Sequence, residues 1–245
     1  MSLAKPKLKT DEVALAGLFS KKEAAEFITQ GSRHVHSSLL GKKDPLFSCT
    51  HSGIISHSSP SYPWELTSHS QAIFLSSSTE RKQVITQILS LLGIKPSSSL
   101  GDRLWTSLEE ILSNSIFHAY HNPDGTEKYS RKSIANLLSE EKIKINFNAT
   151  AHGVFFSVTD CGQGLSFEKI QQCFKRCYHA ADLSQIETKT GGAGLGMYVI
   201  LELATHLKII SNPKLGTRVS CWLSSQSTYD PDTFSFNFYE GALEL

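Results

Sequence analysis

The segment LWTSLEEILSNSIFHAY, residues 104–120, decides the fold of this chain. Its apolar residues recur at helical spacing and predict an amphipathic helix with one buried stripe. Glu110, Asn114 and His118 are four residues apart and share one side of that helix. An amide oxygen suits Mg²⁺, and a carboxylate one turn away can deprotonate a nucleophile. The alternative is that Glu110 and Asn114 are ordinary surface residues and that His118 is structural.

A second polar segment, Asp160-x-Gly162-x-Gly164, directly follows the apolar run GVFFSVT, which predicts a strand. A carboxylate at the end of a strand can accept a hydrogen bond from an exocyclic amine such as adenine N6. Glycines at positions 162 and 164 let the backbone turn sharply and approach a flat ring. The alternative is a simple turn with no ligand.

A glycine-rich run, GGAGLG at residues 191–196, opens another apolar helix that is predicted to end near Thr205. Exposed N–H groups at a helix N-terminus bind phosphate, and glycines permit its close approach. The run does not match the G-x-G-x-x-G dinucleotide pattern and lacks the Gly-Lys-Ser/Thr ending of a P-loop. The alternative is a flexible hinge. In combination and in this order, the three segments indicate a nucleotide pocket.

The remaining pattern alternates strands with helices. Strands are predicted at 71–77, 142–149, 206–212 and 217–223, and helices at 79–93 and 166–179. The helix that carries Glu110 is expected to be capped by Asp102. A short helix is expected at 134–141. Hairpins favour antiparallel pairing, so the expected fold class is an α/β two-layer sandwich: a mixed, mostly antiparallel sheet covered on one face by helices. The alternation in residues 142–147 predicts a strand with one wet face.

The chain divides into three parts. Residues 71–225 form the expected nucleotide-binding domain, residues 1–70 an N-terminal extension of unknown role, and residues 226–245 a C-terminal tail. An amphipathic helix is predicted from Asp11 to about Gln30. The tail sequence TFSFNFYEG alternates in the way that an edge strand does.

The bulk composition excludes several classes of protein. The 245 residues are 40% hydrophobic, enough for one large domain or one domain plus an extension. The net charge is +1 and the basic residues are scattered, which argues against a nucleic-acid partner. No apolar run is long enough to span a membrane, and residues 1–10 lack the apolar core of a signal peptide.

The cysteines indicate reduced thiols in a cytoplasmic protein. There are five, without a C-x-x-C pair, so neither a disulfide framework nor a zinc ribbon is predicted. Cys173, Cys177 and His179 could suggest a metal site, but their spacing is helical and no fourth ligand is nearby.

The ordered segments resemble the GHKL, or Bergerat-fold, ATPases, a histidine-kinase-like ATPase family. Glu110-x-x-x-Asn114 is similar to the N box, Asp160-Cys-Gly-Gln-Gly164 to the first glycine box, GGAGLGMYV to the second, and Gly216-Thr217 to the last. The resemblance covers roughly residues 71–225. It implies ATP and Mg²⁺ as cofactors and an ATP lid at residues 180–193.

The resemblance also implies a role for each matching residue. Asn114 would hold Mg²⁺, Glu110 would be the general base, and Asp160 would bind adenine N6 with Thr217 and a water molecule. The first-box glycines would shape the adenine pocket. The implied phosphate-side residues come from the second box: Gly192, Gly194, Leu195 and Gly196, with Lys189 as the nearest cation.

Within the superfamily, the chain most resembles the anti-sigma-factor serine kinases, because LEEILSNSIFHAY places Glu before the metal-binding Asn and His after it. This implies phosphorylation of a serine on a partner protein, or sequestration of that partner. The partner would be a sigma factor or an anti-anti-sigma-like substrate. Homodimerisation is implied by the resemblance alone.

Two departures leave alternatives open. The arginine that often precedes the second glycine box in the serine kinases is a glycine here, which favours a non-catalytic nucleotide-sensing module that changes partners as its lid orders. The run GGAGLG looks more like the histidine-kinase version, which favours the ATP-binding half of a split histidine kinase. No phosphoacceptor helix is recognisable, since SRHVHSSLL and CTHSGIIS do not fit.

Overall fold

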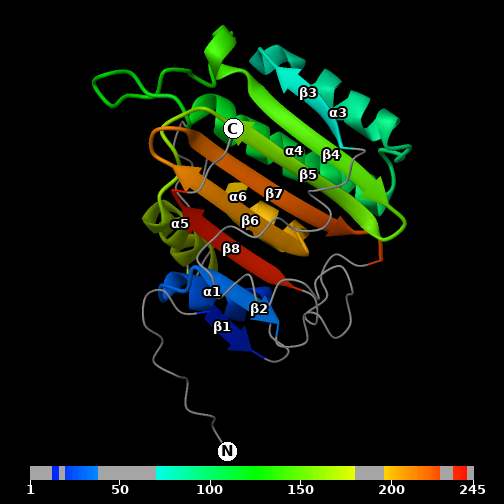
Figure 1. The fold of residues 1–245 in the computed structure, drawn as a ribbon, viewed down its shortest axis with the longest axis vertical. Helices are drawn as coiled ribbons and strands as arrows, with labels where there is room; N and C mark the ends of the chain where they lie inside the picture. The colour runs from blue at the N-terminus through cyan, green and yellow to red at the C-terminus, as the bar shows by residue number, and fades with distance from the viewer. Residues whose placement is uncertain (1–12, 17–19, 38–69, 180–195, 227–233, 242–245) are drawn as a thin grey trace, which may run out of the picture.

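The computed structural model describes residues 13–16, 20–37, 70–179, 196–226 and 234–241. Their strands form one eight-stranded sheet in the order β1-β2-β8-β6-β7-β5-β4-β3 (Figure 1). The pairs β1–β2 and β6–β8 are parallel, and the other neighbours are antiparallel. The strands are β1 (Val13–Ala16), β2 (His34–Ser37), β3 (Gln71–Leu75), β4 (Ile143–Thr150), β5 (Gly153–Asp160), β6 (His206–Asn212), β7 (Gly216–Ser224) and β8 (Ser235–Glu240).

Helices pack along one face of this sheet. Helix α4 contacts β4, β5 and β7, α3 and α6 pack against α4, and α5 lies between α6 and α1 (Figure 1). The predicted α/β sandwich, with a mixed and mostly antiparallel sheet, is confirmed. The helices are α1 (Lys21–Thr29), α3 (Arg81–Leu91), α4 (Ser99–Phe117), α5 (Phe167–His179) and α6 (Gly196–Leu203). None of the helices that the structure describes is both long enough and apolar enough to cross a membrane.

Strands β4 and β5 show how the sequence directs the core. In β4, Ile143, Ile145 and Phe147 are buried while Lys144 is exposed, as the alternation predicted. Every residue of β5 is buried, because this strand lies between β4 and β7 in the interior of the sheet. The strand ends at Asp160, so the backbone position of this residue is fixed by a strand inside the sheet.

The start of α4 differs from the prediction. The capping residue is Ser98, whose Oγ accepts the N–H of Gly101 at 3.1 Å, and Asp102 lies inside the first turn. Gly101 explains the earlier start, because a Cβ at this position would stand 3.1 Å from the carbonyl carbon of Lys95. The incoming chain therefore folds back closely over the first helical turn, which only a glycine permits.

The helix predicted at 134–141 is also wrong: the structure has only a 3-10 turn at Ser139–Glu141. Glu141 is 8% exposed, and its carboxylate is bound by Lys128 Nζ at 2.6 Å and by Tyr129 OH at 2.5 Å. Its carbonyl oxygen accepts a hydrogen bond from Tyr120 OH at 2.8 Å. These long-range bonds, rather than local helix propensity, order the connection between α4 and β4.

The N-terminal helix predicted from Asp11 to Gln30 is wrong in its first half. Val13–Ala16 forms β1, whose backbone pairs with β2, and a capping box between Ser20 and Glu23 starts α1. Lys21, the first residue of α1, connects this helix to α6 through hydrogen bonds. Its Nζ donates to the carbonyl oxygens of Leu201 and Ala204 at the end of α6.

The tail was predicted as an edge strand, and this is also wrong. Strand β8 lies between β2 and β6, and the edges of the described sheet are β1 and β3. The alternating Phe236 and Phe238 are buried against α5, where their rings contact Phe174 and Phe167. The backbone pairing of β8 with both β2 and β6 therefore places it inside the sheet.

Candidate functional site

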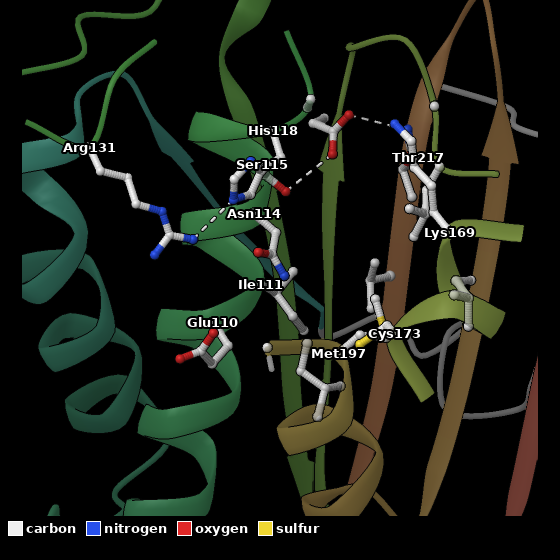
Figure 2. Close-up of a pocket in the computed structure, with 18 residues that line it drawn as sticks. Glu110, Ile111, Asn114, Ser115, His118, Arg131, Lys169, Cys173, Met197 and Thr217 are labelled. Carbon is white, nitrogen blue, oxygen red and sulfur yellow. Dashed lines mark hydrogen bonds between the residues drawn. The ribbon is translucent and has the colours of Figure 1, made fainter. Parts of the chain in front are cut away.

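A cavity of about 430 Å³ lies between α4, α5, α6 and the ends of β5 and β7 (Figure 2). This volume falls within the range of roughly 300–1,000 Å³ that small-molecule sites occupy. The structure brings together in one place side chains that are separated by up to about a hundred positions in the sequence. The predicted site residues that line the cavity are Glu110, Asn114, Asp160, Gly164, Gly196 and Thr217, with His118 beside them.

Asp160 lines the cavity and is 5% exposed. Its Oδ1 accepts the N–H groups of Gly162 at 3.1 Å and Thr217 at 3.3 Å, and its Oδ2 accepts the hydroxyl of Ser115 at 3.1 Å. Burial raises the pKa of this carboxyl from 3.8 to about 6, and the three hydrogen bonds partly oppose that rise. The group is therefore a fixed and mostly ionised acceptor at neutral pH.

Ser115 was missed by the sequence analysis. It stands next to Asn114 on α4 and is itself buried, as are Ser107 and Ser113 of the same helix. A hydroxyl inside an apolar stripe needs a partner, because burying it unpaired is costly. The partner of Ser115 is the Asp160 carboxylate, which the sequence alone did not show.

The glycines of the first box make close contacts within the protein. A Cβ at Gly162 would stand 2.7 Å from the Cβ of Ala119 and would collide with the Ala119 carbonyl. Gly164 has a φ of +78°, and its Cβ would stand 2.8 Å from the carbonyl oxygen of Asn212. Both glycines are therefore required by contacts within the protein, which hold the turn after Asp160 against α4 and β6.

Only the last glycine of the second box can be placed. Gly196 is the first residue of α6, and a Cβ there would stand 2.6 Å from Glu110 Oε2 and 3.1 Å from Asn114 Nδ2. The start of α6 thus touches the two candidate residues of α4. The other predicted phosphate-side residues, Lys189, Gly192, Gly194 and Leu195, lie outside the described residues, as does the predicted lid at 180–193.

Glu110 and Asn114 are available to a ligand. Both side chains are partly buried at the cavity wall, and within the described part of the chain neither makes a side-chain hydrogen bond. The described residues contain no cluster of three or more His, Cys, Asp or Glu side chains that could hold a metal ion. A cation at Asn114 would therefore take most of its ligands from water and phosphate, which is the coordination that Mg²⁺ favours.

His118 is held by two charged residues. Its Nδ1 lies 2.5 Å from Glu127 Oε1, and its Nε2 lies 3.1 Å from an Nη of Arg131. Arg131 also lines the cavity and was missed by the sequence analysis, because a lone arginine in a polar loop carries no pattern.

Helix α5 supplies three further lining residues that the sequence analysis missed. Lys169, Ile170 and Cys173 lie on one face of this helix, at helical spacing. Burial raises the pKa of the Cys173 thiol to about 12, so it is protonated and packs as a small side chain. The apolar face of the helix was the available signal, although the sequence alone did not show what it would face.

Comparison with known proteins identifies the domain. Residues 100–227 match the family described as histidine kinase-, DNA gyrase B- and HSP90-like ATPase. The chain belongs to this family. The matched span of this ATPase domain contains Glu110, Asn114, Asp160, Gly196 and Thr217, so the cavity that they line belongs to the ATPase domain.

Curated relatives of the ATPase domain include the sensor histidine kinase CpxA of Escherichia coli (strain K12) and the sensor protein CpxA of Escherichia coli O6:H1. Each is 27% identical to this chain across 50% of the chain's length. The match covers only 31% of the length of those relatives.

Proposed function

We propose that this chain is an ATP- and Mg²⁺-dependent protein kinase that phosphorylates a serine of a partner protein, in the manner of the anti-sigma-factor serine kinases. The observation that carries the proposal is the pairing of Glu110 with Asn114. The two residues lie one turn apart on α4, at the wall of the same cavity as Asp160, and neither side chain is engaged by a described residue.

Asp160 would select adenine. Its carboxylate is ionised at neutral pH and fixed by Ser115, Gly162 and Thr217, so it can accept a hydrogen bond from the exocyclic N6 amine. The Thr217 side chain lines the cavity beside it and is positioned to support the base through its hydroxyl or a water molecule. A keto group at the same position, as in guanine, would meet a second acceptor and be disfavoured.

Asn114 would bind the metal through its side-chain oxygen. Mg²⁺, when bound, supplies neutralisation of the phosphate charge and bridges phosphate oxygens. The phosphates would lie toward the N-terminus of α6, where backbone N–H groups favour anions. Gly196 is the described member of that wall, and we assign Gly192, Gly194, Leu195 and Lys189 to the same wall from the sequence.

Glu110 would be the general base. A serine hydroxyl must lose its proton as it attacks the γ-phosphate, and a carboxylate one turn from the metal-binding residue can accept that proton. A neutral histidine acceptor already carries a lone pair and does not need this base. The presence of Glu110 at the cavity therefore favours a hydroxyl acceptor over an imidazole.

A second candidate is the ATP-binding half of a split histidine kinase. The observation that favours it is the similarity to the CpxA sensor kinases across half of this chain. In that case the acceptor histidine would be on a separate protein.

The first test is calorimetric titration of the chain with a non-hydrolysable ATP analogue, with and without Mg²⁺. We expect Mg²⁺-dependent binding that Asp160→Asn weakens and that Asn114→Ala makes independent of Mg²⁺. The absence of binding by the wild-type chain would contradict an ATP site. Phosphate transferred from labelled ATP to a candidate partner then separates the two kinase reactions, since phosphoserine survives acid and phosphohistidine does not.

A separate variant, Glu110→Gln, tests whether Glu110 is the general base of a kinase. Glu110→Gln keeps the size and polarity of the side chain but cannot accept a proton. We expect it to abolish transfer while ATP binding is retained. Equal transfer by this variant would remove Glu110 as the base, and ATP that is bound but never consumed with any partner would support the non-catalytic sensing module instead.

A further inference from the structure

Arg131 lies at the cavity although it belongs to no predicted motif. It comes from the connection between α4 and β4, and Figure 2 shows its side chain reaching toward α4. One of its Nη atoms lies 3.1 Å from His118 Nε2, and the guanidinium lies 5.7 Å from the centre of the Phe117 ring. Lys169 also lines the cavity, but it comes from α5 on another side of the site.

The hydrogen bond with Arg131 determines which ring nitrogen of His118 carries the proton. An arginine side chain has five N–H donors and no acceptor, so Nε2 of His118 must be the acceptor of this hydrogen bond. The ring proton is therefore on Nδ1, which donates to Glu127 Oε1 at 2.5 Å. Glu127, His118 and Arg131 form a chain of hydrogen bonds in which the neutral imidazole orients the guanidinium.

The loop that carries Arg131 is itself anchored. Lys128 and Tyr129 both bind the carboxylate of Glu141, and the N–H of Lys128 donates to the Tyr120 carbonyl at 2.9 Å. These bonds fix the backbone two residues before Arg131. The arginine is thus positioned by its loop and by α4 without help from a ligand.

The negative charges at the cavity indicate a function for Arg131. Among the described residues, two carboxylates, Glu110 and Asp160, line the cavity. A nucleoside triphosphate would add several negative charges next to Glu110, which requires cations on the protein as well as the metal. A guanidinium with donors left over after one hydrogen bond is suited to grip phosphate oxygens with two N–H groups.

We propose that Arg131, oriented by the Glu127–His118 pair, binds the phosphate chain of the nucleotide from the α4 side of the site. This inference rests on the proposed function, because it takes ATP as the ligand. It assigns to a loop between α4 and β4 a role that the sequence analysis had given to Lys189. His118 and Glu127 are positioning residues in this arrangement, because they act through Arg131.

The test compares how tightly each variant binds ATP, ADP and adenosine by calorimetry. We expect Arg131→Ala to weaken ATP binding by roughly 10- to 100-fold, the range for a lost charged hydrogen bond, and to leave adenosine binding unchanged. Glu127→Ala should show a smaller loss with the same preference for ATP. Lys132→Ala is the matched control, because it removes an equal charge from the neighbouring exposed residue, which does not line the cavity.

The outcomes are separable. If Arg131→Ala loses no affinity for ATP, or loses equal affinity for ATP and adenosine, the proposed role of Arg131 is wrong, although the ATP site remains. A loss of equal size in Lys132→Ala would reduce the effect to general charge and would also overturn it. A wild-type chain that binds neither ATP nor adenosine would instead contradict the proposed function. Arg131→Lys keeps the charge without the fork, so a partial loss restricted to ATP supports the proposal independently of any folding defect in the alanine variant.

Discussion

Gly196 and Glu110 touch across the candidate site. A Cβ built on Gly196, the first residue of α6, would stand 2.6 Å from Oε2 of Glu110 on α4. The nearest obstacle is thus the tip of a flexible side chain and not backbone. This contact means that the sequence of the second glycine box and the sequence of the N box constrain each other directly.

Gly196→Ala should therefore affect the site more than the fold. The added methyl group would push the Glu110 carboxylate aside and crowd Asn114, whose Nδ2 would lie 3.1 Å away. We expect a change in the free energy of unfolding of less than about 1 kcal/mol, since the side chain of Glu110 can move and alanine favours the helix. Phosphate transfer and the Mg²⁺ dependence of ATP binding should both be lost. Urea denaturation combined with calorimetry measures the two effects, and a variant that unfolds readily would contradict this reading of the contact.

Asp160 should make stability depend on pH in a distinctive way. Its pKa is about 6 in the folded protein and near 3.8 when exposed, so the native state binds the proton more tightly between these values. The contribution of the Asp160 carboxyl to the free energy of unfolding is therefore highest below pH 4, and it falls as the pH rises from about 4 to about 6. At neutral pH the buried carboxylate costs about 3 kcal/mol, by the conversion of two pKa units.

Asp160→Asn removes that cost and tests it. The amide has the same shape: its Oδ1 can keep the bonds from the N–H groups of Gly162 and Thr217, and its Nδ2 can donate to the Ser115 hydroxyl, which reverses that bond. We expect its free energy of unfolding at pH 7 to exceed that of the wild type by up to about 3 kcal/mol, with no difference at pH 4 and with weaker ATP binding. Denaturation of both proteins from pH 4 to pH 8 provides the comparison, since all other groups cancel. A variant less stable than the wild type at pH 7 would show that the hydrogen bonds outweigh the burial.

Gly162→Ala separates packing from ligand approach. A Cβ at position 162 meets the backbone and Cβ of Ala119, which cannot move without shifting the end of α4. We expect a loss of about 2–3 kcal/mol in the free energy of unfolding. Gly125→Ala is the control, because nothing lies within 4 Å of its added Cβ and only its positive φ of +82° is strained. Destabilisation no larger than in the control would leave the approach of a flat ring as the reason for the glycine.

The sequence predicted those parts of the site that repeat a local physical rule. Glu110 and Asn114 were found because their spacing puts them on one helix face, and Asp160 because it follows a buried strand. Ser115 and Arg131 were not found, because their roles depend on what packs against them. Ser115 meets Asp160 only when β5 docks on α4, and Arg131 reaches the cavity only because Glu141 anchors its loop. The same limit applies to the fold: β8 alternates as an edge strand does, and only its pairing with both β2 and β6 places it inside the sheet.

Lys21 tests whether the N-terminal segment is part of the folded domain. Lys21 is 6% exposed, and its Nζ binds the carbonyl oxygens of Leu201 and Ala204 at the end of α6, whose first residue is Gly196. Lys21→Ala leaves those carbonyls without this donor and opens space in the core, so we expect a loss of about 2–4 kcal/mol in the free energy of unfolding. Lys22→Ala, at the exposed neighbouring position, should change it by less than about 0.5 kcal/mol.

Because α1 lies outside the span that matches the ATPase family, the number of unfolding transitions in Lys21→Ala is informative. A shift of one cooperative transition would mean that the N-terminal segment and the ATPase domain unfold together. A separate early transition in Lys21→Ala, with the main one unmoved, would mean that the segment docks on a domain that is stable without it.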